Sequence, residues 1–241
     1  MKILCVIPAR YASTRLPGKP LLQLAGKPMV WRVYERASRA ELPQKTVVAT
    51  DSQEIYDTIL HMGGQAVMTR SDHPTGTDRL AEVAELFPEF DIIVNVQGDE
   101  PLIEPCVIDQ LAEALINDRE AQMATCMNEM DEEEYNNPAA VKVVTDINGS
   151  ALYFSRSVLP YPRNKTGVPV YKHIGIYAYR REFLIKYAKM APTPLELTES
   201  LEQLRALENG YKIKVIKVPF KFYGVDTLED FLRVEKILCE L

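Results

Sequence analysis

The sequence predicts an α/β protein with a mainly parallel sheet flanked by helices and a smaller antiparallel region. Short apolar runs alternate with amphipathic segments through the first half of the chain, and this alternation predicts right-handed strand–helix–strand crossovers. The first run, residues 3–7, is almost continuously apolar, which is typical of a strand covered on both faces. Later, Asn148-Gly149 lies between two strand-like runs and indicates a hairpin, hence antiparallel pairing.

Length and composition favour one large soluble domain. The chain has 241 residues, so we expect a single domain over 1–241, with a smaller region at about 132–200 within it. Its apolar fraction of 46% and charged fraction of 26% are those of ordinary globular proteins. The net charge of −6 disfavours a nucleic-acid partner, because non-specific binding to phosphates needs a basic face.

The cysteines and the apolar runs predict a cytoplasmic location. Cys5, Cys106, Cys126 and Cys239 show no Cys-x-x-Cys spacing, so they suggest neither a zinc site nor a disulfide framework, and free thiols fit a reducing cytosol. The apolar run before Pro8 is shorter than a signal-peptide core, and no later run approaches the ~20 apolar residues of a membrane span.

The remaining elements follow from periodicity and capping signals. In the first half, strands are expected at 46–50, 66–68 and 91–96, and helices at 28–40, 78–86 and about 105–117. A further helix is expected between a cap at Asp51 or Ser52 and an end at Gly63-Gly64. In the second half, the acidic run 128–138 is expected to be a solvated connection and 157–169 to be irregular; strands are expected at 141–146, 151–155, 171–179 and 212–218, and helices at 198–209 and from about 226 onward.

The loop after the first strand has the composition of an anion-binding loop. Pro17 and Pro20 stiffen it, and it lies at the carboxyl end of a strand, where open α/β sheets bind ligands. It matches neither a Walker A sequence nor a Gly-x-Gly-x-x-Gly fingerprint, and this disfavours an ATPase or a dehydrogenase function. An ordinary solvated loop is the alternative to a polyphosphate site. Its three cations and two hydroxyls are Arg10, Arg15, Lys19, Ser13 and Thr14.

Carboxylates and hydroxyls follow two other strands. Asp99 comes directly after the strand at 91–96, beside Gly98, where a carboxylate is well placed for a hard cation such as Mg²⁺. Asp99 and Glu100 could equally cap the helix at 105–117. Thr75 and Thr77 follow the strand at 66–68 and are either helix caps or groups that contact the edge of a base.

The second half concentrates side chains that suit a carboxylated sugar. Arginine binds a carboxylate through two parallel hydrogen bonds, and the other polar groups match sugar hydroxyls. Each of these residues also has an ordinary structural explanation, such as a surface ion pair or a histidine satisfied within a strand. The residues are Arg156, Arg163, His173, Tyr177, Glu202 and Gln203.

Residues 7–20 closely resemble the opening of the bacterial 3-deoxy-manno-octulosonate cytidylyltransferases, and the resemblance extends through nearly the whole chain. The further motifs that carry it are 97–101, 153–156, 173–177, 201–205 and 223–230. This resemblance implies a Rossmann-like nucleotidyltransferase sheet and a Mg²⁺-dependent homodimer. It also implies transfer of CMP from CTP to the anomeric hydroxyl of 3-deoxy-manno-octulosonate (Kdo), with release of pyrophosphate, for lipopolysaccharide biosynthesis.

The resemblance also implies residue roles. Catalytic residues would be Lys19, Arg10, Arg15 and Asp99; nucleotide ligands would be Arg10, Ser13, Thr14, Lys19, Met68, Arg70, Asp72, Thr77 and Gln97; metal ligands would be Asp99 and Asp226; and sugar ligands would be the six residues given above, in the region at about 132–200 and just beyond it. The segment between Arg163 and His173 looks shorter than in some members. There are two alternatives to a Kdo cytidylyltransferase. One is a cytidylyltransferase for another sugar acid, such as a sialic acid, and the other is a non-catalytic nucleotide-binding module.

Overall fold

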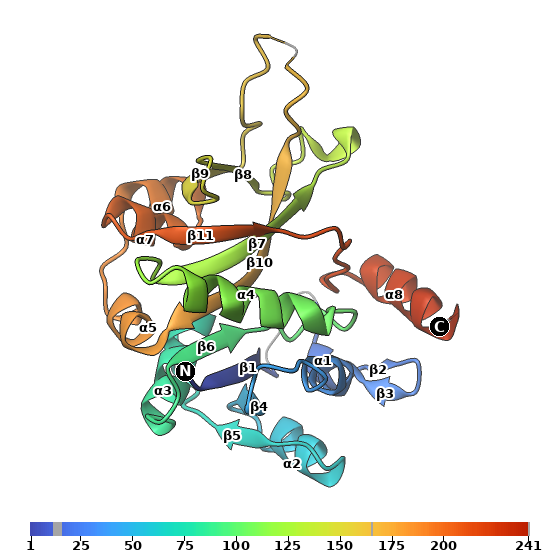
Figure 1. Cartoon of the computed structure of the whole chain (residues 1–241). Helices are drawn as coiled ribbons and strands as arrows, with labels where there is room; N and C mark the ends of the chain where they lie inside the picture. Colours follow the sequence, from blue (N-terminus) through green and yellow to red (C-terminus); the bar gives the residue numbers. More distant parts are fainter. Residues whose placement is uncertain (12–15, 165, 241) are drawn as a thin grey trace.

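The computed structural model describes residues 1–11, 16–164 and 166–240, and its centre is a twisted sheet (Figure 1). Within the described residues, the main path of this sheet has the order β11-β7-β10-β6-β1-β4-β5, and β8 and β9 extend it from one end of β10. The strands are β1 (Ile3–Ala9), β4 (Lys45–Thr50), β5 (Ala66–Met68), β6 (Ile92–Asn95), β7 (Met123–Glu129), β8 (Lys142–Thr145), β9 (Ala151–Ser155), β10 (Tyr171–Arg180) and β11 (Ile213–Lys217), with a separate hairpin of β2 (Gln23–Leu24) and β3 (Lys27–Pro28).

The strand directions confirm the predicted fold class. The pairs β1–β4, β1–β6, β4–β5 and β7–β11 are parallel, whereas β10 is antiparallel to both of its neighbours, β6 and β7. The hairpin of β8 and β9 around Asn148-Gly149 forms as expected. However, β10 does not belong to the antiparallel region alone: Tyr171 and Lys172 pair with β8, and residues 177–180 pair with β6 in the main sheet.

Helices cover both faces of the sheet, and this explains the apolar run of β1. Ile3, Cys5 and Ile7 pack in the core beneath α1, α2 and α4, while Leu4 and Val6 pack in the core beneath α3, α5 and α7. Alternate side chains of a strand point to opposite faces, so a strand in the middle of a covered sheet is apolar at every position. The helices are α1 (Met29–Ala37), α2 (Gln53–His61), α3 (Gly76–Leu86), α4 (Pro105–Asn117), α5 (Arg181–Ala188), α6 (Pro194–Glu199), α7 (Gln203–Glu208) and α8 (Leu228–Glu240), with 3-10 turns η1 (Lys19–Leu21) and η2 (Glu132–Glu134).

The carboxyl ends of the parallel strands bring distant loops together. The loop after β6 crosses the end of β1 closely: a Cβ added at Gly98 would lie 2.6 Å from the carbonyl oxygen of Pro8. Only glycine permits that approach. Because β10 is antiparallel, its first half extends past the end of β6 and reaches the same edge of the sheet.

Several elements differ from the sequence-based prediction. The helix expected at 198–209 is two helices, α6 and α7, separated at Ser200, whose φ of 51° is left-handed. The first helix starts earlier than expected, at Pro194, where Thr193 and Glu196 form a capping box. It ends at Glu199, before the leucines at 201, 204 and 207 on which the single-helix prediction depended. The elements without a prediction include β7, the central antiparallel partner of β10, and α5, which packs against α3; the short hairpin of β2 and β3 had none either.

A long connection between β9 and β10 projects away from the sheet (Figure 1). Its residues 160–164 and 166–168 are exposed, and Tyr161 keeps 84% of its surface accessible. Among the helices described, none combines the length and the apolar character needed to cross a bilayer.

Candidate active site

Lys19 joins two carboxylates that are far apart in sequence. The residue opens η1, directly after Gly18, whose φ is 66°. Its Nζ donates hydrogen bonds to Asp99 Oδ2 at 2.8 Å and to the Val225 carbonyl oxygen at 2.9 Å, and it lies 3.3 Å from Asp226 Oδ1. The loops after β1, after β6 and before α8 therefore meet at one ammonium group.

The backbone around these carboxylates is held independently of their side chains. The Val225 N–H donates to the Asp99 carbonyl oxygen at 2.9 Å, which ties the two loops together. At the start of α8, Thr227 Oγ1 accepts from the Asp230 N–H, and the Asp230 carboxylate accepts from the Thr227 N–H. Thr227, rather than Asp226, thus caps the helix. The cap of α4 is Glu104, so capping does not explain Asp99 either.

The donor set fits a magnesium ion. The Asp99 and Asp226 side chains, 31% and 49% exposed, offer carboxylate oxygens within reach of one point. Magnesium prefers such oxygens, and usually takes one or two carboxylates from the protein and its other ligands from phosphates and water. Across residues 1–11, 16–164 and 166–240, no group of three or more His, Cys, Asp or Glu side chains forms a metal site. An ion held by these two carboxylates would take its remaining ligands from substrate phosphates or from water.

Glu100 is a nearby acid to which the sequence assigned no functional role. Burial is the main cause that raises the pKa of Glu100 to about 8, and the negative charge of Asp99 is the second. The side chain lies against the backbone at Gly224, where an added Cβ would be 3.1 Å from Glu100 Oε1. It packs behind the loop that carries Asp226.

Arg10 connects the first loop to the start of α3. Its Nη2 donates to the Thr75 carbonyl oxygen at 2.7 Å. Thr75 and Asp78 form the capping box of α3, so Thr75 is the helix cap and Thr77 lies inside the first turn. Three further residues predicted from this loop, Ser13, Thr14 and Arg15, fall outside the described residues.

The loop after β5 places its predicted nucleotide ligands at the surface. Arg70 Nε donates to Asp72 Oδ1 at 2.9 Å, and these side chains are 67% and 72% exposed. The hydrogen bond from Arg70 lowers the pKa of Asp72. Met68 is 40% exposed. These three residues occupy the predicted edge of the sheet, but none of them reaches the ammonium group of Lys19.

A cavity of about 160 Å³ lies between the ends of β6 and β10 and the starts of α3 and α7. It brings together two nucleotide ligands predicted from sequence, Thr77 and Gln97, and three predicted sugar ligands, Tyr177, Glu202 and Gln203. The Gln97 amide donates to the Gly175 carbonyl oxygen at 3.1 Å. The other residues that line the cavity had no predicted role: Gly76, Asn95, Met123, Tyr179 and Tyr187.

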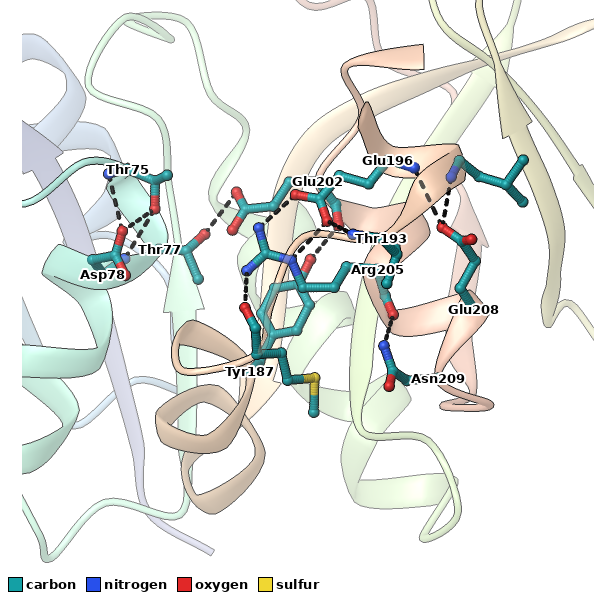
Figure 2. Close-up of polar contacts among 12 residues, drawn as sticks. Thr75, Thr77, Asp78, Tyr187, Thr193, Glu196, Glu202, Arg205, Glu208 and Asn209 are labelled. Carbon is teal, nitrogen blue, oxygen red and sulfur yellow. Dashed lines mark hydrogen bonds and ion pairs between the residues drawn. The ribbon is translucent and has the colours of Figure 1, made fainter. Parts of the chain in front are cut away.

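Glu202 is the acid of this cavity, and a polar network holds it (Figure 2). Thr77 Oγ1 donates to Glu202 Oε2 at 3.0 Å, and Tyr187 Oη donates to the Glu202 carbonyl oxygen at 2.5 Å. Burial raises the pKa of Glu202. Below it, Arg205 and Glu196 form a buried two-contact ion pair of 2.5 and 2.8 Å that anchors α7 to α6. The cavity wall is therefore rigidly supported.

His173 supports the cavity wall from behind. Its Nε2 lies 3.0 Å from Thr125 Oγ1, and its ring packs 5.0 Å from that of Phe154 and 5.5 Å from that of Tyr177, between centroids. Burial lowers the pKa of His173 to about 3, so the ring is neutral at pH 7. His173 is not among the described residues that line the cavity.

The two arginines predicted to bind a carboxylate lie elsewhere. The Arg156 guanidinium donates to three backbone carbonyl groups, those of Glu199 at 2.7 Å, Pro138 at 2.8 Å and Ser200 at 3.3 Å. Arg163 is exposed on the projecting connection. Neither lines the cavity. Their role as carboxylate ligands stays a prediction.

Comparison with known proteins agrees with this geometry. A family model described as cytidylyltransferase matches residues 4–213. A 3-deoxy-manno-octulosonate cytidylyltransferase of Fusobacterium nucleatum is 52% identical over 100% of this chain and 98% of the relative. One of Geobacter metallireducens is 51% identical over 97% of this chain and 96% of the relative.

Solved structures give the same result. A structure of CMP:2-keto-3-deoxy-manno-octonic acid synthetase complexed with CTP superposes with a TM-score of 0.96 at 43% identity, covering 100% of this chain and 99% of the other. A 4-diphosphocytidyl-2C-methyl-D-erythritol synthase of Anaerococcus prevotii shares the fold, with a TM-score of 0.65 at 14% identity over 99% of this chain and 96% of the other. This chain belongs to the family of 3-deoxy-manno-octulosonate cytidylyltransferases.

Proposed function

We propose that this chain transfers CMP from CTP to the anomeric hydroxyl of Kdo, with Mg²⁺, and gives CMP-Kdo and pyrophosphate. The observation that carries the proposal is the meeting of Asp99 and Asp226 at Lys19, beside a cavity lined by hydroxyl and amide groups. The similar structure that is described as complexed with CTP supports the choice of nucleotide.

The residues at the carboxyl end of the sheet would have separate roles in the transfer reaction. When bound, Mg²⁺ would be held by Asp99 and Asp226 and would polarise the α-phosphate and acidify the attacking hydroxyl. Lys19 and Arg10 would stabilise negative charge on the departing pyrophosphate, because their cationic groups follow the carboxyl end of β1, the edge at which open α/β sheets bind ligands. Transfer of this kind depends on positioning and charge rather than on a covalent intermediate.

The sugar acid binds beside the phosphates. Thr77, Tyr177, Glu202 and Gln203 present hydroxyl, carboxylate and amide groups that match sugar hydroxyls. The carboxylate of the acid binds outside this cavity, at cationic side chains of the neighbouring loops, with Arg156 and Arg163 as candidates on the side of the projecting connection.

The assembly and location belong to the same proposal. We infer a homodimer formed through the projecting connection, because the prolines and the exposed Tyr161 and Val168 give it a stiff, partly apolar surface. The four cysteines form no disulfide, which fits the reducing cytoplasm, where a sugar acid is activated for lipopolysaccharide assembly.

A substrate matrix tests the activity. Four nucleoside triphosphates are combined with Kdo, a sialic acid and a neutral sugar 1-phosphate, and pyrophosphate release is followed with Mg²⁺ and with EDTA. We expect release only with CTP, Kdo and Mg²⁺ together. Preferred turnover of the sugar 1-phosphate refutes the proposal, and release that persists in EDTA refutes the metal role. A preference for the sialic acid keeps the mechanism and changes the acceptor.

A further inference from the structure

Two buried amide side chains in the cavity have unused hydrogen-bonding capacity. Asn95 and Gln203 each retain only 5% of their accessible surface, and both line the cavity. In the described part of the chain, Asn95 Oδ1 and Gln203 Nε2 have no hydrogen-bond partner. One is an acceptor and the other a donor. A buried polar atom without a partner costs about 1–3 kcal/mol, so stability alone does not explain either residue.

Asn95 occupies a position where the fold favours an apolar side chain. It is the last residue of β6 and lies on the same face as Ile93, which belongs to the core beneath α3 and α5. In the antiparallel pair of β6 and β10 it lies directly opposite Tyr177, another lining residue. Cross-strand partners share a face of the sheet, so the Asn95 side chain is on the cavity side.

The charge of the cavity indicates which part of a sugar acid it accepts. Among the described residues, its lining includes the carboxylate of Glu202 and no lysine or arginine. A ligand carboxylate would be repelled there, whereas hydroxyl groups would be matched. The rings of Tyr177, Tyr179 and Tyr187 follow one another at centroid distances of 5.7 and 6.3 Å and offer apolar surface to the C–H groups of a sugar.

We propose that Asn95 is a further ligand of this cavity, whose Oδ1 accepts a hydrogen bond from a hydroxyl of the sugar acid beside Gln203, while the carboxylate of the acid stays outside the cavity. A hydroxyl both donates and accepts, so it satisfies an amide oxygen and an amide N–H at once. Asn95 is thereby a specificity residue. This inference rests on the proposed function, since it takes the hydroxyl-rich acceptor as the ligand of the cavity.

The variant Asn95→Leu tests the role, because it keeps the approximate shape of the side chain and removes its polar atoms. We expect the KM for Kdo to rise roughly tenfold, as for one lost neutral hydrogen bond, with the KM for CTP unchanged. We also expect the melting temperature to stay equal or to rise, since a buried unsatisfied oxygen disappears. A purely structural asparagine gives the opposite pair of results, a lower melting temperature with an unchanged KM.

Asn128 offers a matched control. Its Oδ1 also lacks a partner in the described residues, but its Nδ2 donates to the Phe220 carbonyl oxygen at 3.1 Å, and it lines a different cavity. Asn128→Leu should lower the melting temperature and leave the KM for Kdo unchanged. An equal rise in KM in both variants overturns the inference.

Deoxygenated analogues of Kdo identify the hydroxyl and avoid dependence on one variant. The wild-type enzyme should have a higher KM for one monodeoxy analogue than for Kdo. Asn95→Leu should have the same KM for that analogue and for Kdo. Asn95→Ala replaces this variant if Asn95→Leu does not fold. Equal losses in wild type and variant for every analogue overturn the inference and leave the proposed function standing. A wild-type protein that releases no pyrophosphate from CTP and Kdo overturns both.

Discussion

Replacing Lys19 by methionine should strengthen magnesium binding while it abolishes most of the transfer activity. The Lys19 ammonium lies 2.8 Å from Asp99 and 3.3 Å from Asp226, so it competes with a cation for the same two carboxylates. The three side chains are 15%, 31% and 49% exposed, and partly exposed ion pairs contribute about 0.5–1 kcal/mol each. Two pairs give about 1–2 kcal/mol, or a roughly 5- to 30-fold gain in magnesium affinity without nucleotide. Loss of a preorganised charge should lower turnover by about two to three decades.

Calorimetric titration of the nucleotide-free protein with MgCl₂ measures the first effect, and single-turnover pyrophosphate release measures the second. Lys27→Met is a matched control, because Lys27 forms an ion pair of 2.8 Å with Glu35, and neither residue is among those placed in the site. It changes the net charge equally and should alter neither quantity. Magnesium affinity that is unchanged or weaker in Lys19→Met would refute the shared site. Weaker binding of CTP with an unchanged chemical step would make Lys19 a ground-state anchor.

Three further outcomes are expected. Asp99→Asn and Asp226→Asn should each lower turnover by about two to three decades, measured by pyrophosphate release at saturating CTP, and should cost no more stability than the ~0.5–1 kcal/mol of one partly exposed ion pair. Near-normal rates in a folded variant remove that residue from the metal site. Gly98→Ala should lower the melting temperature, because its Cβ would lie 2.6 Å from the Pro8 carbonyl oxygen, and an unchanged value would contradict this packing. Burial lowers the pKa of His173 to about 3, so below about pH 6.5 the unfolded chain binds a proton that the folded chain does not bind. The free energy of unfolding should therefore fall as the pH drops from 7 toward 4. Urea unfolding of His173→Gln should show a weaker dependence of this free energy on pH.

Local patterns were sufficient for most of the parallel half of the fold. The apolar run at β1 forms the expected strand, and of the two candidate caps for each helix, Ser52 caps α2 and Thr75 caps α3. These signals act over a few residues. The failures have equally local causes. Ser200 in the left-handed conformation ends α6 just before the leucines at 201, 204 and 207, and periodicity alone does not reveal such a break. The strand β7 contains Met, Ala and Cys rather than a clear run of β-branched residues, and pairing with β10 and β11 stabilises it.

The chemical groups of the site can be read from the chain alone: a cationic loop after the first strand, carboxylates that follow β6 and precede α8, and the family motifs. How these groups combine depends on the folded arrangement. Lys19, Asp99 and Asp226 are separated by 80 and 207 positions and meet because parallel strands end at one edge of the sheet. Contacts between distant segments also leave Arg156 bound to backbone carbonyl groups and place Asn95 in the cavity wall. Hydrogen-bond partners and burial depend on contacts between distant segments, and a linear pattern does not encode them residue by residue.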